Sequence, residues 1–384
     1  MKLGIAVVVI NFVSALTVPT VAWPGSTAVR VVDQADVLGG NISGLTVAGP
    51  SSLWAVRDGP SALSRLDRSA AGWAPSRDSN GSRALQYADG SGSPDAEAVT
   101  TAAGDDTVVF VGAERDSDKP NTSRNSILRF DTSGVGTLRA TQQWELGSVL
   151  PATGANAGIE GLTWIADDVF VAMGFRDATG KTYVPADYPG HGRGLFVVGL
   201  EQNGVLYVTA LGDDGGVALV ASMPSGLSTV MEVVWSPARQ ELWAICDNTC
   251  DGVAAVLRPS DGTFALSVIV QPPPGMASLN NEGFAFGPSC ADNTMTAVWA
   301  DDGAAGGHVI REATLSCTAI AIAGAATAPT TLPPPSTKPF VENRPNDSPS
   351  NNDRSLAVLV GLAVVLTVGL TAAIALLRRT RRPR

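Results

Sequence analysis

Acidic residues recur at two fixed places in a repeated pattern along this 384-residue chain. Four glutamates open short apolar runs, and we expect them to converge as channel acids: Glu97, Glu160, Glu232 and Glu282. Five aspartates end the apolar runs that follow, and we expect them to supply metal ligands: Asp58, Asp116, Asp177, Asp247 and Asp301. Carboxylates that meet in one mouth repel one another, raise one another's pKa values and favour a hard cation with oxygen ligands. The pattern predicts a calcium site, with the alternative that the glutamates accept backbone N–H bonds from neighbouring repeats.

Three of these aspartates directly follow an arginine in the sequence, and these arginines are Arg57, Arg115 and Arg176. A guanidinium group binds phosphate bidentately, so the three arginines are candidate phosphate ligands. Neighbouring side chains on a strand point to opposite faces, and an arginine therefore joins its aspartate only where the chain leaves the strand. The alternative is that the Arg-Asp pairs form structural ion pairs between repeats. The insertion over residues 177–193 adds tyrosines, a lysine and His191 that could serve in recognition.

The elements that must position these residues follow from five repeats of one layout. A first short strand is expected in each repeat, beginning at Ser43, Glu97, Glu160, Glu232 and Glu282. The second strand is expected over residues 53–58, 108–116, 169–177, 242–248 and 296–302, and the third from residues 62, 126, 194, 254 and 308. Outer strands are expected over residues 204–211 and 264–270.

Short strands, the lack of a long amphipathic helix and one such unit per repeat predict an all-β fold, a β-propeller with five recognisable blades. The spacing of the repeats is uneven, and the sequence is also compatible with a degenerate sixth blade. Residues 29–32 are expected to complete the last blade and close the ring. A row of β-sandwich modules is the alternative, but the repeats are too short for sandwich domains of about 100 residues.

Several of these motifs are similar to those of one known family. The segments NNEGFAFGP at residues 280–288 and GIEGLTWIADDVFVA at residues 158–172, with the third-strand endings RLD and RFD, resemble the phytase-like propeller family, described as esterase-like activity of phytase. The likeness spans roughly residues 41–317. It implies a propeller and hydrolysis of an ester or phosphoester with bound calcium. The first repeat departs from the family pattern with Ser43, and the second reads EAV. The chain has no GxSxG motif to support a serine-esterase mechanism.

The two ends of the chain predict export and a membrane anchor. Residues 1–22 have one lysine, an apolar core and a small-residue end, which is typical of a signal peptide. Residues 355–377 carry no charge and are long enough to span a bilayer. Five arginines in residues 378–384 place that end in the cytoplasm. Residues 325–354 are rich in Pro, Thr and Ser and are expected as a stalk, which leaves residues 28–324 as the folded ectodomain outside the cell membrane.

Charge and cysteine content narrow the function. Without Lys2 and the five tail arginines, 20 basic residues face 36 acidic ones, which disfavours nucleic-acid binding and suits cations. Four cysteines in an exported chain predict two disulfides. Three pairings are compatible with the sequence, and we favour Cys246–Cys250 with Cys290–Cys317. A zinc site lacks support because neither histidine stands at ligand spacing from the cysteines.

Two functions stay open from the sequence. The first is a calcium-dependent hydrolase of a small-molecule ester or phosphoester, anchored at the cell surface by a single membrane pass. The second is a non-catalytic propeller that binds a surface polymer or a partner protein. The channel acids discriminate between them, because a hydrolase needs a metal or a base within reach of its substrate.

Overall fold

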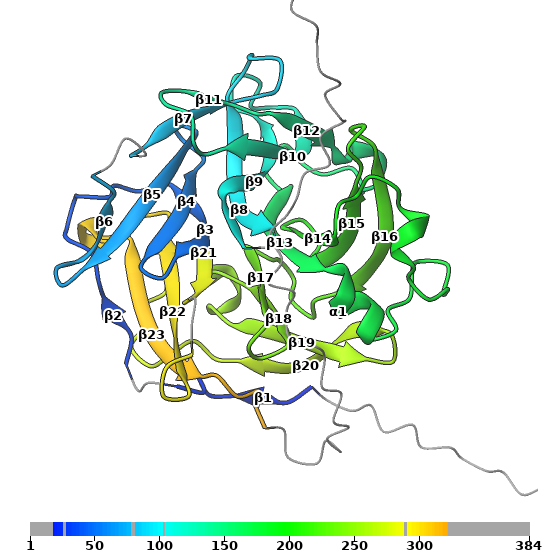
Figure 1. The fold of residues 1–384 in the computed structure, drawn as a ribbon. Coiled ribbons are helices and arrows are strands. Elements are labelled where there is room, and N and C mark those ends of the chain that lie inside the picture. The colour runs from blue at the N-terminus through cyan, green and yellow to red at the C-terminus, as the bar shows by residue number, and fades with distance from the viewer. Residues whose placement is uncertain (1–17, 26–27, 78–80, 103, 288–289, 322–384) are drawn as a thin grey trace, which may run out of the picture. The chain divides into compact units, whose positions relative to one another are not determined.

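The computed structural model describes residues 18–25, 28–77, 81–102, 104–287 and 290–321. These residues form five sheets arranged as blades around a central axis, with one short α-helix among them (Figure 1). The predicted all-β propeller is confirmed, and it has five blades. A sixth blade is absent from the part of the chain that the structure describes.

Each blade is described from the axis outward. The first has β3 (Ile42–Gly49), β4 (Ser52–Arg57), β5 (Ala62–Ser69), β7 (Arg83–Gln86) and β11 (Leu138–Arg139), and β6 (Gly72–Pro75) also pairs with β5. The second has β8 (Pro94–Ala102), β9 (Asp105–Asp116), β10 (Ser123–Asp131) and β12 (Gln142–Glu145). The third has β13 (Ile159–Ala166), β14 (Gly194–Leu200), β15 (Val205–Leu211) and β16 (Val217–Pro224). The fourth has β17 (Glu232–Ser236), β18 (Glu241–Ile245), β19 (Ala254–Ser260) and β20 (Thr263–Val270), and the fifth has β21 (Asn281–Phe286), β22 (Thr294–Asp301) and β23 (Ile310–Ser316).

The N-terminal segment closes the ring. Strand β2 (Arg30–Val31) pairs antiparallel with β23 and completes the fifth blade, as predicted for residues 29–32. Strand β1 (Thr20–Val21) adds in parallel to the outer edge of β20, although these two residues fall within the expected signal peptide. Trp23 follows and packs against Trp243 and Trp299, with ring centroids 6.1 and 5.2 Å apart. The N-terminal segment is thus tied to two neighbouring blades, the fourth and the fifth.

The third blade differs from the predicted layout. The expected second strand over residues 169–177 is instead helix α1 (Asp167–Ala172) followed by a loop, so the prediction of a strand there was wrong. Residues 194–200 form the second strand, residues 205–211 the third, and residues 217–224 an outer strand that the sequence analysis missed. A short apolar run does not distinguish a strand from a helix by its pattern. Gly174, with φ of 62°, lets the chain turn back after the helix.

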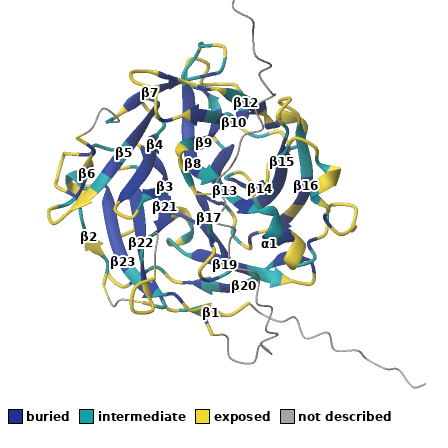
Figure 2. Cartoon of the chain, viewed as in Figure 1, coloured by how far each residue is buried: buried dark blue, intermediate teal, exposed yellow. Residues whose placement is uncertain are grey.

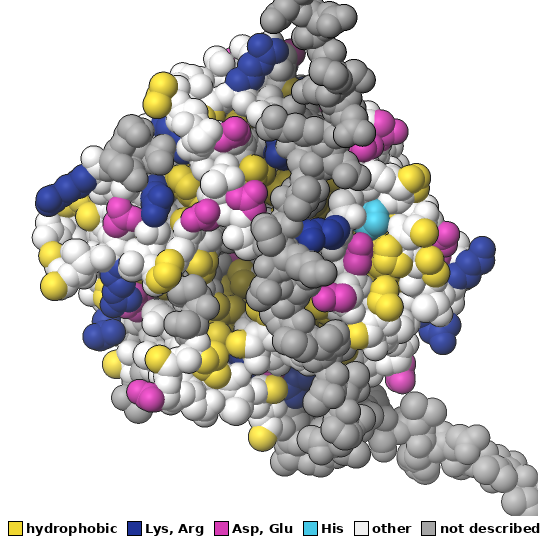
Figure 3. Space-filling view, in the orientation of Figure 1, with side chains coloured by type: hydrophobic (Ala, Val, Ile, Leu, Met, Phe, Trp, Pro, Cys, Tyr) yellow, Lys and Arg dark blue, Asp and Glu magenta, His cyan; other side chains and the backbone are white. Residues whose placement is uncertain are grey.

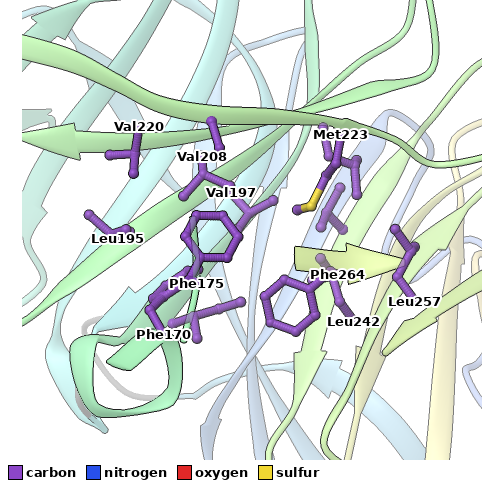
Figure 4. Close-up of a cluster of buried hydrophobic side chains, with 14 of the residues drawn as sticks. Phe170, Phe175, Leu195, Val197, Val208, Val220, Met223, Leu242, Leu257 and Phe264 are labelled. Carbon is purple, nitrogen blue, oxygen red and sulfur yellow. The ribbon is translucent and has the colours of Figure 1, made fainter. Parts of the chain in front are cut away.

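The core consists of apolar layers between adjacent blades. Figure 2 shows the inner strands of every blade as buried. One such layer joins the third and fourth blades, and Figure 4 shows its side chains converging from both. Phe264 of β20 lies there against Phe170 and Phe175, with ring centroids 6.1 and 6.5 Å apart. Helix α1 and the loop after it therefore contribute side chains to the core where the sequence predicted a strand.

Three glycines allow the innermost strands to approach one another. A Cβ on Gly44 would lie 2.7 Å from the backbone oxygen of Glu97. A Cβ on Gly161 would lie 2.6 Å from the backbone nitrogen of Val233, and one on Gly283 would lie 3.0 Å from Leu45 Cγ. Each of these atoms belongs to the next blade. The glycine in the repeated motif is thus required by blade-to-blade contact rather than by chemistry.

Both favoured disulfides are present. Cys246 pairs with Cys250, and Cys290 pairs with Cys317. No free cysteine occurs in the part of the chain that the structure describes. The second disulfide joins the segment after β21 to the end of β23 and so closes the fifth blade.

The predicted membrane helix at residues 355–377 lies outside the described residues, as do the stalk, the tail and residues 1–17 of the expected signal. Within the described ranges, no helix has both the length and the apolar character needed to cross a bilayer.

A substitution at the axis tests the blade contact. We expect Gly161→Ala to lower the free energy of unfolding by about 1–3 kcal/mol, because its Cβ would overlap the backbone of β17. The matched control is Gly49→Ala, also on an innermost strand, where nothing lies within 4 Å of the added Cβ. Urea denaturation followed by circular dichroism measures both. Equal stability of the two variants would contradict the close approach.

Candidate functional site at one mouth of the channel

The first strands of the repeats line the channel, and their beginnings meet at one end of it. The structure places Glu97 on β8, Glu160 on β13, Glu232 on β17 and Glu282 on β21, all innermost strands. Ser43 of β3 holds the corresponding place in the first blade. We call this end the acidic mouth, defined by Asp58, Asp95, Glu97, Glu160, Glu282 and Asp302.

The tightest group at the acidic mouth joins two blades. Asp58, which follows β4, and Asp95 and Glu97 of β8 each offer a carboxylate oxygen within 4.8 Å of the others. Asp58 Oδ1 also accepts a hydrogen bond of 2.6 Å from the backbone N–H of Gly59. Asp95 forms an ion pair with Arg115. The sequence analysis missed Asp95, although its i, i+2 spacing from Glu97 on one strand was a signal.

Two glutamates at this mouth are buried without a partner. Glu97 and Glu160 are each 6% exposed, and no hydrogen-bond donor among the described residues reaches either carboxylate. Burial raises the pKa of Glu97 well above its usual value, and the nearby Asp95 and Glu282 carboxylates raise it further. Burial likewise raises the pKa of Glu160, followed by repulsion from Glu97. A buried, unpartnered carboxyl is costly unless it holds a proton or binds a cation.

Glu282 completes this electrostatic group from the fifth blade. Burial and then the carboxylate of Asp302 raise the pKa of Glu282 to about 8. Its Oε1 accepts a hydrogen bond of 2.8 Å from Asn280 Nδ2, and its side chain is less buried than that of Glu97. The pKa of Asp302 is itself raised by burial and by Asp58. Glu282 can therefore exchange protons near neutral pH.

Glu232 has a different role from the other three glutamates. Its Oε1 accepts hydrogen bonds from the backbone N–H groups of Val233, at 2.9 Å, and of Leu162, at 3.3 Å. The N–H groups of Leu45 and Phe284 also favour its ionised form, although burial dominates and raises its pKa. These four N–H groups belong to β17, β13, β3 and β21. The structural alternative for the repeated glutamates thus holds for Glu232, which links four blades at the axis.

Three of the predicted metal ligands hold loops at the ends of second strands. Asp116 accepts hydrogen bonds of 3.1 Å from the backbone N–H groups of Ser93 and Asp118. Asp247 accepts one of 2.9 Å from the N–H of Thr249. Asp301 accepts them from Gly303 and Ala305, at 3.1 and 2.8 Å. An aspartate that bonds the backbone two residues on stabilises a turn, so their recurrence has an architectural cause.

The three candidate phosphate ligands lie in different environments. Arg57 donates to the backbone carbonyl oxygens of Leu38 and Gly40. Arg115 bridges Asp95 and Glu114, and it alone of the three contacts the acidic mouth. Arg176 and Asp177 lie in the loop after α1, beyond the opposite end of β13, where Arg176 donates to the carbonyl of Gly180. The structure therefore does not bring the five aspartates or the three arginines into one site.

The insertion over residues 177–193 packs onto helix α1 at the opposite end of the channel. The Tyr183 hydroxyl donates a hydrogen bond of 2.8 Å to Asp167 Oδ1, and His191 Nε2 lies 3.1 Å from Asp167 Oδ2. The hydrogen bond with Asp167 raises the pKa of His191. Tyr183 and His191 lie at the other end of the channel from the acids of β8 and β21, so neither serves the acidic mouth.

Sequence analysis also missed Glu114, which lies behind Arg115. Burial raises the pKa of Glu114 to about 7, and its Oε2 accepts a hydrogen bond of 3.0 Å from the backbone N–H of Gly158. Glu201 and Asp302 were missed as well. Glu114 stands two residues before Asp116, and Asp302 directly follows Asp301, so both were visible only as neighbours of acids already chosen.

Comparisons with known proteins supply a family and a set of distant structures. A family model described as "Phytase-like: Esterase-like activity of phytase" matches residues 38–304. No curated protein matches the chain. Among solved structures, the PQQ-bound aldose sugar dehydrogenase of Streptomyces coelicolor is 12% identical, with 76% of this chain and 99% of that chain covered and a TM-score of 0.36.

Two further structures show similarly low likeness. The WD40 domain of Toxoplasma gondii coronin is 10% identical over 75% of this chain and 61% of that chain, with a TM-score of 0.35. The Malassezia sympodialis allergen Mala s 1 is 8% identical over 71% and 75% of the two chains, with a TM-score of 0.34. Similarity at this level carries no argument about the chemistry of the chain.

The raised pKa values predict how stability depends on pH. The folded protein holds protons on Glu97, Glu160 and Glu282 that the unfolded chain, with a glutamate pKa of 4.5, releases. The free energy of unfolding should therefore fall as the pH rises from about 4.5 through about 8 in chelator-treated protein. Thermal melts from pH 5.5 to 8.5 measure this. Glu97→Gln should flatten the decline, whereas Asp177→Asn should leave it unchanged, and equal slopes for all three proteins would refute the coupling.

Proposed function

Because the chain belongs to the phytase-like family, we propose that it is a calcium-dependent hydrolase of esters or phosphoesters that acts at the acidic mouth. The observation that carries this proposal is the group formed by Asp58, Asp95 and Glu97, with carboxylate oxygens within 4.8 Å of one another. Only Arg115 offsets these charges by direct contact among the described residues. The acids of the mouth thus remain in need of protons or a cation.

The donor set fits calcium in chemistry and in spacing. Calcium prefers carboxylate and carbonyl oxygens at about 2.3–2.6 Å, so two oxygens that share one ion lie at most about 5 Å apart. The carboxylate oxygens of Asp58, Asp95 and Glu97 lie within 4.8 Å of one another, which meets this condition. The other described group of possible metal ligands consists of Cys246, Asp247 and Cys250. It is unsuitable because the two cysteines form a disulfide with each other. Asp58, Asp95 and Glu97 would therefore hold the ion, with Glu160 facing Glu97 as a further carboxylate.

The residues of the chain supply the remaining chemistry. When bound, calcium supplies a Lewis acid that polarises a phosphoryl or carbonyl oxygen. Glu282, whose pKa is raised to about 8 by burial and by Asp302, would donate a proton to the leaving oxygen while a water molecule attacks. Arg115 orients Asp95 through their ion pair. These roles require the substrate to enter between β8 and β21 at the acidic mouth.

The proposal places this activity at the cell surface. It is supported by the signal-like residues 1–22, the uncharged residues 355–377 and the basic residues 378–384. The two disulfides agree with export to an oxidising compartment. A membrane-attached enzyme with its substrate site outside would act on small extracellular esters.

A non-catalytic propeller that binds a surface polymer or a partner protein is the second candidate. It is favoured because many of the repeated acidic residues bond the backbone and so hold the fold together. Glu232 bonds backbone N–H groups at the axis, and Asp116, Asp247 and Asp301 hold loops. In that case the residues of the acidic mouth would bind an ion without turning over a substrate.

Calcium binding is tested by thermal melting of the full chain in detergent. A hundredfold excess of calcium over its Kd stabilises the fold by about 2.7 kcal/mol, which raises Tm by a few degrees. The increase should be larger at pH 8 than at pH 5.5, because protons compete for the same carboxylates. The double variant Asp58→Asn/Glu97→Gln should lose the increase, and Asp177→Asn should keep it. A calcium response that survives the double variant would remove this site.

Hydrolysis is tested separately with glycerol 2-phosphate and ethyl acetate, whose alkoxide leaving groups need a proton. Glu282→Gln should lower kcat by about a hundredfold or more while the calcium-induced rise in Tm persists, because the acid donates a proton and does not hold the ion. Asp177→Asn again serves as the control. A calcium response without hydrolysis of either ester would favour the binding propeller over the enzyme.

A further inference from the structure

The opposite end of the channel forms a cavity of about 700 Å³. Its walls come from the later residues of the five innermost strands, among them Val47, Val99, Trp164, Trp235 and Phe286. Figure 3 shows this face, with hydrophobic side chains bordering the hollow. The volume lies within the range of about 300–1,000 Å³ that is usual for sites of small molecules. The acids of the acidic mouth are not part of its lining.

The lining is almost free of charge. Asp106 is the one ionisable side chain among the described residues around the cavity, apart from the disulfide-bonded Cys290, and Asp106 is exposed. No lysine, arginine or histidine lines the wall. A phosphate or carboxylate ligand would therefore enter without a cation to pair with, in a chain with a net charge of −10. The cavity fits an uncharged ligand.

Two tryptophans of the wall are left with a free hydrogen-bond donor. Trp164 and Trp235 are half-buried, and neither indole Nε1 has an acceptor among the described residues. The indole N–H groups of Trp23, Trp54, Trp73, Trp144 and Trp243 donate to the protein, whereas that of Trp299 in the fifth blade has no acceptor among the described residues either. Buried tryptophans usually find such a partner. Trp164 and Trp235 differ from Trp299 because both line one cavity, from neighbouring blades.

These indoles are held in place from behind. A Cβ on Gly194 would lie 2.4 Å from the ring of Trp164, so the absence of a side chain there makes room for the indole. Trp235 makes an edge contact with Phe264, with ring centroids 5.6 Å apart, and its backbone N–H donates to Thr163 Oγ1 at 3.2 Å. Fixed aromatic surfaces lose little conformational entropy on binding.

The wall also offers neutral polar groups. The hydroxyls of Thr46, Thr101 and Ser236 belong to lining residues. Each innermost strand pairs with a strand on one edge only among the described residues, so its other edge turns backbone N–H and C=O groups toward the axis. Apolar side chains, indole rings and uncharged donors and acceptors thus alternate around the cavity.

From this lining we infer that the cavity binds a neutral carbohydrate, as the end of a glycan chain or as a free oligosaccharide. A pyranose ring has an apolar C–H face that stacks on an indole and a rim of hydroxyls that both donate and accept. An acyl chain would satisfy the apolar wall but leave the indole N–H groups and the strand edges without partners, which costs free energy. The inference does not rest on the hydrolase proposal, because the site shares no residue with the acidic mouth.

Titration calorimetry on the full chain in detergent tests this inference. The probes are maltotriose, cellotriose and mannotriose as neutral trisaccharides, a trigalacturonate of similar size, and N-phenyl-1-naphthylamine as an uncharged apolar compound. At least one neutral trisaccharide should bind, and the trigalacturonate should not. Trp164→Phe and Trp235→Phe keep an aromatic surface and remove only the indole N–H, so each should weaken binding about tenfold. Trp144→Phe, at a tryptophan outside the cavity, should bind as the unchanged protein does.

Two further measurements separate this site from the acidic mouth. Asp58→Asn/Glu97→Gln should leave trisaccharide binding unchanged, and Trp235→Phe should leave the calcium-induced rise in Tm unchanged. Thermal melts of each tryptophan variant establish that it is folded. The inference is overturned if no neutral trisaccharide binds at millimolar concentration, if only the apolar compound binds, or if the folded tryptophan variants bind the trisaccharide as well as the unchanged protein.

Discussion

The closure of five innermost strands around one axis is the constraint on which the rest of this propeller depends. Among the described residues each of these strands pairs with a strand on one edge, so its other edge and its blade-to-blade contact must both be satisfied at the centre. Gly44, Gly161 and Gly283 make the contact close enough, and Glu232 accepts backbone N–H groups from the strands around it. One carboxylate at the axis thereby offsets polar groups that the ring leaves unpaired.

The same geometry forces the other repeated acids together. Because the innermost strands begin at one end of the channel, Glu97, Glu160 and Glu282 cannot avoid one another, and burial adds to their repulsion. Asp58 and Asp95 lie beside them. Such a cluster lowers the stability of the ionised fold, and a fold that keeps it gains the means to bind a cation or to move a proton.

The channel consequently has two unlike ends. The strand beginnings supply carboxylates, whereas the strand ends supply indoles, methyl groups and hydroxyls around a cavity of about 700 Å³. Glu232, the first residue of β17, accepts hydrogen bonds from the backbone N–H groups of Leu162 and Val233, and these two residues also line the cavity. The two proposed sites share no residue, so the variants that remove one need not disturb the other.

The sequence by itself determined the all-β propeller, the five repeats and the closing strand β2, because strand-length apolar runs and recurring motifs reflect local geometry that each repeat satisfies alone. It favoured the observed cysteine pairs but left three pairings compatible, and the structure decided between them. The sequence did not distinguish α1 from a strand, since the short apolar run over residues 169–172 satisfies either pattern. Tertiary structure decided which acids meet. Asp116, Asp247 and Asp301 bond their own loops, Asp177 lies beyond the other end of β13, and Asp95 and Glu97 face Asp58 across two blades. A residue type that recurs in each repeat indicates an equivalent position in each blade. The chemistry at that position depends on neighbouring residues, and only the closed ring brings those residues within reach.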